Sequence, residues 1–259
     1  MDGVPEDEPT GSLPIKVFLL VGGLGKRLRS LVNDVPKPMA PIHGQPFLEY
    51  QLHLLSRYGL RHFVLCAGYM ASKIIEYFGD GSRWGYTVEY SVEKTLMGTG
   101  GALQLASRFI DADAPFLVMN GDTYFDVDYR AIVAYHQQMQ EQRGSFIGTL
   151  VLTHSTDKSR YGSVAIDEES KRILSFAEKA QDSNSSLISA GIYVLEPEIL
   201  RYIPNDRPVS IERDVFPSLC SSSALYGMPV EGLFVDIGTP EGYLYLSQNL
   251  APLLTAKDR

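Results

Sequence analysis

The sequence predicts an α/β fold built on a single Rossmann-like, doubly wound mixed sheet. Strand-length apolar runs alternate with helix-length amphipathic segments over the first half of the chain, which is the pattern of β-α units in a parallel sheet. The second half is richer in strands that are joined by short connections, so the sheet is predicted to be mixed. A glycine loop and an aspartate each follow an apolar run, and doubly wound sheets bind their ligands at such strand ends.

The first half is predicted to contain four strands and four helices. Residues 15–21 and 116–119 are continuously apolar and end at glycine-containing turns, as buried strands do. Residues 62–67 are also apolar, whereas residues 86–93 alternate as a half-buried strand does. Helices are predicted where apolar residues recur at helical spacing, at 46–58, 71–78, 101–109 and 127–142.

The second half is predicted to add six short strands and three helices. The strands are predicted at 145–152, 162–166, 173–178, 187–195, 225–228 and 232–235, and the helices at 196–202, 211–219 and 240–250. Because no repeat or linker interrupts the pattern, residues 15–259 are expected to form one domain. Residues 15–143 are expected to form the half of the domain that binds the nucleotide, and residues 144–259 the half that binds a second substrate. The acidic segment 1–14, rich in Pro and Gly, is predicted to be a disordered leader.

Composition places the chain among ordinary globular proteins. Of its 259 residues, 44% are hydrophobic and 21% are charged, and the formal net charge of −8 argues against nucleic-acid binding as its main role. No apolar run approaches the ~20 residues of a membrane helix, and the chain does not begin with a signal-peptide pattern. Two cysteines, and five histidines without zinc-type spacing, predict a reducing, cytoplasmic location and no zinc site.

The glycine loop at 21–28 is the strongest functional signal. Its backbone N–H groups, with Lys26, Arg27 and then Lys37 nearby, are predicted to cradle phosphate oxygens. It is not a P-loop, because Arg27 stands where that motif needs Ser or Thr. It is not a dinucleotide fingerprint, because Leu28 replaces the required small residue. The loop predicts a nucleoside triphosphate site, with a plain glycine turn as the alternative.

Two aspartates share one pattern. Asp122 and Asp236 each follow a short apolar strand and precede a turn. Mg²⁺ prefers one or two carboxylates together with phosphate oxygens and water, so acids at these strand ends predict a magnesium site. An aspartate that caps a turn is the alternative for each of them, and the sequence does not reveal whether the two lie together.

Two further segments are candidates for substrate contact. The glycine loop at 97–101 opens a predicted helix, and its backbone either faces a nucleotide base or only turns the chain. Lys179 follows a predicted strand and is a candidate for a second phosphate, with a solvated surface lysine as the alternative.

Seven short motifs, in the order found here, resemble those of the sugar-1-phosphate nucleotidylyltransferases. The resemblance covers nearly everything after residue 15, and the order of the motifs makes it specific, since each alone is weak. The motifs stand at 22–28, 36–39, 98–103, 121–125, 176–179, 190–193 and 236–241. Within the family, segments 38–41, 46–50, 120–125 and 160–164 are most similar to the heptose-1-phosphate guanylyltransferases.

The resemblance implies a fold, a reaction and a cofactor. The fold is the family's glycosyltransferase-A-like one, without the C-terminal β-helix of some larger relatives. The reaction is transfer of GMP from GTP to D-glycero-α-D-manno-heptose 1-phosphate, giving GDP-heptose and pyrophosphate for cell-surface polysaccharide synthesis. Mg²⁺ is the implied cofactor, neither nucleic acid nor membrane is an implied partner, and a homodimer or homotetramer is the implied assembly.

The resemblance also implies roles for individual residues. The nucleotide would be bound by Gly22, Gly23, Gly25, Lys26, Arg27, Gly98 and Thr99. The sugar phosphate would be bound by Tyr161, Gly162, Glu178, Lys179, Ala190 and Gly191. Mg²⁺ would be held by Asp122 and Asp236, and catalysis would rest on Arg27, Lys37 and Asp122.

The chain departs from the family pattern at two positions of the glycine loop. Lys26 stands where the family usually has Thr, and Val21 replaces a usual small residue, which puts the fine geometry of the nucleotide in doubt but not the reaction. Mannose-1-phosphate guanylyltransferase, or transfer to another sugar 1-phosphate, is the alternative within the family. A catalytically inactive subunit that senses nucleotide sugars is the alternative from another class.

Overall fold

The computed structural model of the protein describes residues 11–25, 27–28, 31–143, 146–155, 161–178, 186–222 and 224–256. Its first half forms four parallel strands. Strand β1 (Lys16–Leu20) lies between β4 (His62–Ala67) and β6 (Phe116–Asn120), and β5 (Thr87–Val92) pairs with β4. Leu20 pairs with Asn120, so the carboxyl ends of β1 and β6 lie side by side.

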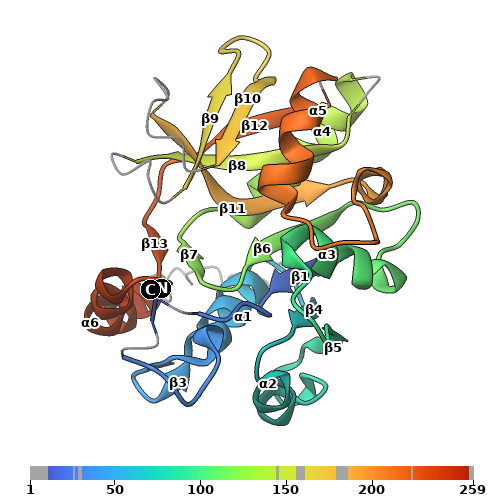
Figure 1. Cartoon of the computed structure of the whole chain (residues 1–259). Helices are drawn as coiled ribbons and strands as arrows, with labels where there is room; N and C mark the ends of the chain where they lie inside the picture. The colour runs from blue at the N-terminus through green and yellow to red at the C-terminus, as the bar shows by residue number, and fades with distance from the viewer. Residues whose placement is uncertain are drawn as a thin grey trace.

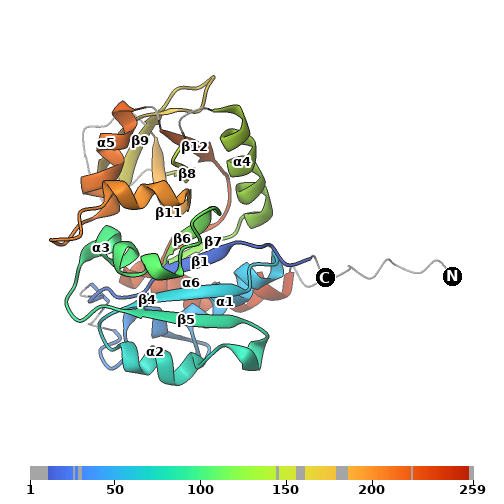
Figure 2. The same cartoon turned by 90° about the vertical axis from the view of Figure 1, so that its right-hand side faces the viewer.

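Helices cover both faces of these strands. Helices α1 (Phe47–Arg57) and α2 (Ala71–Phe78) pack on one face, and α3 (Gly98–Leu105) packs on the other (Figure 2). Along β1, Val17 and Leu19 belong to the first core and Phe18 to the second. Because alternate side chains of a strand point to opposite faces, a strand buried on both sides is apolar throughout, as 15–21 is.

The second half extends the sheet with antiparallel strands. Strand β11 (Leu187–Leu195) pairs antiparallel with β6, and its neighbours are β8 (Gly148–His154) and β9 (Gly162–Ile166). Strand β10 (Ile173–Glu178) extends β9, and β12 (Leu225–Pro229) extends β8. The result is one nine-stranded sheet whose main path runs β10-β9-β11-β6-β1-β4-β5 (Figure 1). The predicted doubly wound mixed sheet is confirmed.

Two of the helices in the second half differ from their predicted form. The segment predicted as a helix at 196–202 is a 3₁₀ helix, η4 (Pro197–Tyr202). The helix predicted at 211–219 begins as a π-helical turn, η5 (Ile211–Val215), and continues as α5 (Phe216–Ser221). Pro217 explains the wide turn, because proline lacks an N–H and its ring crowds the carbonyl four residues earlier. Helix α4 (Tyr129–Gln142) ends where predicted and begins two residues later, after its N-cap Asp128, which accepts hydrogen bonds from two backbone N–H groups.

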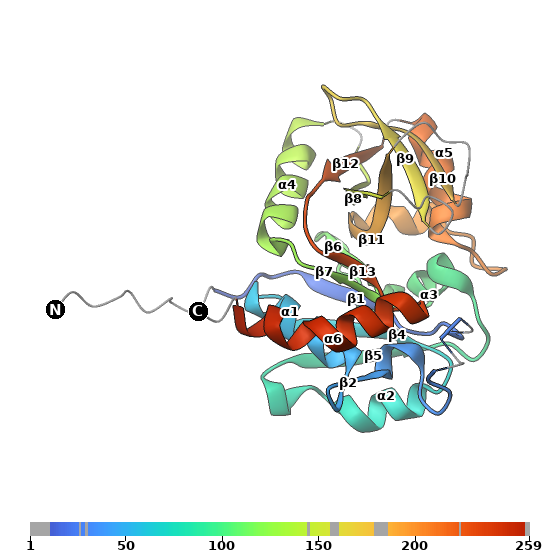
Figure 3. The same cartoon turned by 90° about the vertical axis from the view of Figure 1, so that its left-hand side faces the viewer.

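A pair of short strands shapes the site: the strand at 234–236 corresponds to the one predicted at 232–235, whereas the strand at 123–125 was not predicted. Strand β7 (Thr123–Phe125) pairs antiparallel with β13 (Phe234–Asp236), outside the main sheet, and α6 (Pro240–Ala256) follows β13 (Figure 3). Residues 123–125 are too few to show an alternating pattern. The remaining short elements are β2 (Pro41–Ile42), β3 (Gln45–Pro46) and the 3₁₀ turns η1 (Lys37–Met39), η2 (Ser82–Trp84) and η3 (Ser107–Phe109).

Most of the predicted leader lies outside the described residues. Its end is described from residue 11, and there the Leu13 backbone N–H donates to the Gly59 carbonyl over 3.0 Å. In the part of the chain that the structure describes, none of the helices combines the length and the apolar character needed to span a bilayer.

Candidate functional site

Two adjoining cavities open at the carboxyl ends of β1 and β6. The first has a volume of about 330 Å³ and is lined by the glycine loop, by the loop before α3 and by the end of β6. The second, of about 440 Å³, lies between that edge and strands of the second half. They share four lining residues, Gly98, Thr99, Asn120 and Asp122. A ligand in one cavity would therefore lie next to a ligand in the other.

The glycine loop forms one wall of the first cavity. Gly22 and Gly23 line it, and a Cβ at Gly22 would stand 2.6 Å from Oε1 of Glu93, so a larger residue there would displace the Glu93 carboxylate. Gly25 has a φ of +58° and lies against Lys37, whose Cβ would be 2.9 Å from a Cβ at position 25. Gly25 thus holds the lysine backbone in place and does not line either cavity. Lys26 lies outside the described residues.

Asp122 and Asp236 come together where β7 pairs with β13. Asp236 stands opposite Thr123 in this ladder, and the Ile237 backbone N–H donates to the Asp122 carbonyl over 2.9 Å. Asp122 Oδ2 and Asp236 Oδ1 lie 3.0 and 2.5 Å from the point where a Cβ of residue 238 would stand. The two carboxylates therefore face one small space, although they are more than a hundred residues apart in sequence.

Two cations accompany these acids. The Lys37 ammonium forms an ion pair with Asp122 Oδ2, and the Arg27 guanidinium lies 3.7 Å from Asp236 Oδ2. Asp236 is the more enclosed acid, with a side chain that is 10% exposed, and it accepts a 2.6 Å hydrogen bond from the Gly238 backbone N–H. Burial, and then the neighbouring Asp122 charge, raise the pKa of Asp236.

The donor set suits Mg²⁺. Two carboxylates that face one space at the edge of this cavity suit the ion, since Mg²⁺ takes its remaining ligands from phosphates and water. Among the described residues there is no cluster of three or more His, Cys, Asp or Glu side chains of the kind that holds a metal without substrate. Asp122 and Asp236 are thus candidates for a metal that arrives with phosphate.

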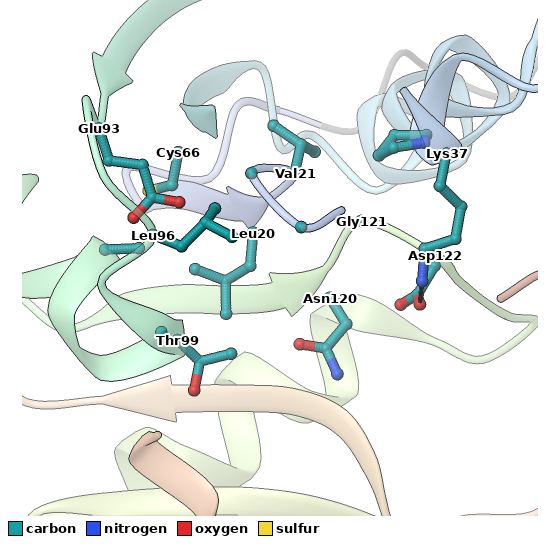
Figure 4. Close-up of a pocket in the computed structure, with 15 residues that line it drawn as sticks. Leu20, Val21, Lys37, Cys66, Glu93, Leu96, Thr99, Asn120, Gly121 and Asp122 are labelled. Atoms are coloured by element: carbon teal, nitrogen blue, oxygen red, sulfur yellow. Dashed lines mark hydrogen bonds and ion pairs between the residues drawn. The ribbon is translucent and has the colours of Figure 1, made fainter. Parts of the chain in front are cut away.

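At the other end of the first cavity stands a carboxylate that sequence reasoning missed. Glu93 follows β5, and its Oε2 accepts a hydrogen bond from the Met97 backbone N–H over 2.9 Å. Figure 4 shows Glu93 and the Lys37–Asp122 pair at opposite ends of the cavity, with Val21 between them. Burial raises the pKa of Glu93, while the Met97 N–H opposes that rise. In sequence, Glu93 looked like the exposed end of an alternating strand.

Glu212 is a second residue that sequence reasoning missed. Its Oε2 accepts hydrogen bonds from the hydroxyls of Thr99 (2.6 Å) and Ser210 (2.8 Å), and its Oε1 accepts from Tyr193 (3.3 Å). Thr99 Oγ1 in turn accepts from the Ile211 backbone N–H over 2.9 Å. The π-helical turn η5 thus holds the first turn of α3 through Thr99, and π-turns often occur at functional sites. A glutamate in a predicted helix carries no signal of such a role.

Most of the residues predicted to bind the sugar phosphate line the second cavity. Tyr161, Gly162, Ala190 and Gly191 do so, together with Arg27 and both acids. Gly191 has a φ of +68° and packs against the Asn120 side chain, which leaves no room for a Cβ. Glu178 ends β10 opposite Gly162, but its side chain, like all of Lys179, lies outside the described residues. Asn120 was not predicted, although its place just before Asp122 at a strand end was a usable signal.

The contact between Thr99 and Glu212 makes a first testable prediction. Thr99→Val should lower the free energy of unfolding by about 1–3 kcal/mol, because it leaves the Ile211 N–H without an acceptor and removes one of the two hydroxyls that donate to Glu212 Oε2. Thr99→Ser keeps the hydroxyl and should cost much less. Urea denaturation of both variants measures the difference, and equal stability of Val and Ser at position 99 would contradict a structural role for this hydroxyl.

Comparison with known proteins identifies a family and several relatives. Residues 16–252 match the family described as nucleotidyl transferase. The mannose-1-phosphate guanylyltransferase catalytic subunit beta of Danio rerio is 37% identical over 232 residues, which are 89% of this chain and 63% of that protein. The mannose-1-phosphate guanylyltransferase of Mycobacterium tuberculosis is 35% identical over 238 residues, 91% of this chain and 64% of that protein. The chain thus spans less than two thirds of the length of these curated relatives.

A solved structure matches over a larger share of its own chain. HddC from Yersinia pseudotuberculosis superposes with a TM-score of 0.75 at 32% sequence identity, covering 91% of this chain and 99% of that one. A second structure of HddC, complexed with GMP-PN, gives a TM-score of 0.74 at 31% identity.

Proposed function

This chain belongs to the nucleotidyl transferase family, and we propose that it transfers GMP from GTP to a sugar 1-phosphate with release of pyrophosphate. The names of the relatives support the guanine nucleotide and the sugar phosphate, and so does the complex of HddC with GMP-PN. The two adjoining cavities support a reaction between two bound substrates.

The observation that carries the proposal is the meeting of Asp122 and Asp236 where the cavities join. Asp122 lines both cavities, and Asp236 lines the second. A triphosphate in the first cavity and a sugar phosphate in the second would bring their phosphates to this point. Residues lining the first cavity all fall between 20 and 122, which supports assigning about 15–143 to the nucleotide half and 144–259 to the sugar-phosphate half.

The reaction needs positioning and charge stabilisation more than proton transfer. The attacking group is a phosphate oxygen of the sugar 1-phosphate, which is ionised at neutral pH, so no general base is required. Its bond to the α-phosphorus forms while the bond from that phosphorus to the oxygen of the β-phosphate breaks, and pyrophosphate leaves. Lys37 and Arg27 would neutralise the phosphate oxygens as charge shifts between them.

The two acids would hold the magnesium ion of this reaction. When bound, the ion would neutralise phosphate oxygens and align the reacting groups. Asp236 is fixed by the hydrogen bond from the Gly238 N–H, and Asp122 by the backbone pairing of its strand end. The chain therefore presents both carboxylates in one orientation before substrates arrive.

Glu93 supports guanine as the base. An ionised carboxylate only accepts hydrogen bonds. The N1–H and the 2-amino group of guanine both donate, so a carboxylate can accept from both of them. Oε1 of Glu93 accepts no hydrogen bond from any described residue, and it faces the glycine loop, where a Cβ at Gly22 would stand 2.6 Å from it. With phosphates at the Lys37 end, the base would lie at the Glu93 end.

We expect Glu93→Gln to weaken the preference for GTP. The variant replaces one acceptor oxygen with an NH₂ group, which cannot accept a hydrogen bond from the guanine 2-amino group. Wild-type protein should prefer GTP to ITP, which lacks that group, by about tenfold or more in kcat/KM, and the variant should lose most of this ratio. Glu89→Gln is the matched control, because Glu89 lies in the strand that precedes Glu93 and pairs with His62. An unchanged GTP to ITP ratio in Glu93→Gln would remove Glu93 from base recognition.

For the sugar, we propose D-glycero-α-D-manno-heptose 1-phosphate, with mannose 1-phosphate as the alternative. The heptose is supported by the resemblance of segments 38–41, 46–50, 120–125 and 160–164 to heptose-1-phosphate guanylyltransferases. Mannose is supported by the names of the curated relatives. Tyr161, Ser189 and Arg213 line the second cavity, where they would meet sugar hydroxyls.

A competition assay decides between these sugars. Equal concentrations of the two sugar phosphates are offered with GTP and Mg²⁺, and the GDP-sugars are separated by mass. Excess GDP-heptose supports the proposal. Excess GDP-mannose replaces the sugar and leaves the reaction in place.

A further inference from the structure

The space that the two acids face already holds a cation supplied by the chain. Three polar atoms surround the point where a Cβ of residue 238 would stand: Asp236 Oδ1 at 2.5 Å, Lys37 Nζ at 2.9 Å and Asp122 Oδ2 at 3.0 Å. The same ammonium forms an ion pair with Asp122. An ion that joined the two carboxylates would have to occupy this space, so Lys37 and a metal ion exclude each other here.

The charges of the cluster are balanced while Lys37 stays. Asp122 and Asp236 carry two negative charges, and Lys37 and Arg27 carry two positive ones, which leaves a net charge of zero. A divalent cation gains little from approaching a neutral cluster, and it must also displace an ammonium that already satisfies Asp122. The nucleotide-free protein is thus poorly prepared to bind Mg²⁺.

Lys37 is built so that its side chain can leave while its backbone stays. Pro36 and Pro38 flank it, the Ala40 N–H donates to its carbonyl over 3.0 Å, and Gly25 packs against its Cβ. The long side chain, in contrast, is a flexible stem with a compact charge. It lines the first cavity, so a phosphate bound there would compete with Asp122 for the ammonium.

We propose that Lys37 is the resident counter-cation of the Asp122–Asp236 pair and that nucleotide phosphate releases it, so that metal binding depends on nucleotide. This inference rests on the proposed function for the identity of the phosphate ligand. Coupling of this kind is reciprocal, so the metal strengthens nucleotide binding by the same factor. The Lys37 ammonium reduces the repulsion between the two acids in the empty site. Its release by nucleotide phosphate would let the metal bind only in the substrate complex.

The test measures Mn²⁺ binding to nucleotide-free protein by electron paramagnetic resonance of the free ion. Lys37→Met should bind Mn²⁺ about tenfold more tightly than wild type, because the competing ammonium is gone and the pair keeps its charge. Lys16→Met is the matched control: it removes the same charge from an ion pair with Asp111 and should bind as wild type does. Adding Asp122→Asn to Lys37→Met should abolish the gain, which locates the ion.

Two results would overturn the proposal. One is Mn²⁺ binding by Lys37→Met that is no tighter than that of wild type, and the other is an equal gain in Lys16→Met. If Lys37→Met unfolds, as thermal unfolding would reveal, Lys37→Gln carries the same expectation with a polar side chain in the space. The assay contains neither GTP nor sugar phosphate, so its failure is distinct from failure of the proposed reaction, which pyrophosphate release by wild-type protein tests separately.

Discussion

Replacing Asp122 with Asn is expected to lower the rate of GMP transfer by about a thousandfold, because losing a metal-held charge at the reacting phosphate costs on the order of 4 kcal/mol of transition-state stabilisation. Asp122 is the acid that lines both cavities, so its charge would act on ligands in either of them. The fold should persist. The backbone bond from Ile237 to the Asp122 carbonyl does not involve the side chain, and Asn still accepts from Lys37.

Initial rates of pyrophosphate release at saturating substrates measure this effect, and thermal unfolding checks the fold. Asp111→Asn is the matched control, since that carboxylate pairs with Lys16 outside both cavities. Near-wild-type turnover in Asp122→Asn would show that this aspartate only shapes a turn.

Gly238→Ala is expected to cost at least about a hundredfold in turnover, since displacement of reacting groups by about 1 Å has effects of that size. Its methyl group would stand 2.5 Å from Asp236 Oδ1 and 3.0 Å from Asp122 Oδ2, inside the space that the two acids face. It would push the carboxylates apart and occupy the place of a cation. The backbone at 238 does not have a positive φ, so alanine brings no backbone strain.

Gly23→Ala is the comparison variant. A Cβ there meets nothing within 4 Å, although Gly23 also lines the first cavity. Gly238→Ala should therefore lose far more activity than Gly23→Ala at similar stability in urea. Equal turnover of the two variants would contradict the geometry assigned to the acids.

Most strands of the main sheet could be predicted from the sequence. The predicted bounds of β4, α2, β9, β10 and β11 are those of the structure, because long apolar or periodic segments bounded by turns leave little freedom. The helix predicted at 101–109 begins earlier, at Gly98, and breaks at Ala106. Its start is set by hydrogen bonds from Gly100 and Gly101 to the Val209 carbonyl, a contact over long sequence distance that no local pattern reveals.

The site was less predictable than the sheet. The pattern singled out Asp122 and Asp236 one at a time, but their meeting depends on pairing between the three-residue strands β7 and β13. Glu93 and Glu212 look in sequence like ordinary surface glutamates. Their positions depend on Met97, Thr99 and Tyr193, which tertiary packing brings to them.

Pyrophosphate release with Mg²⁺, measured for each of the four ribonucleoside triphosphates with heptose 1-phosphate and with mannose 1-phosphate, tests the central claim most directly. The account predicts release with GTP and one of these sugar phosphates, lost in Asp122→Asn and retained in Asp111→Asn. No release with any pair, in protein that still binds GTP, would contradict catalysis at this site and favour a protein that senses nucleotide sugars.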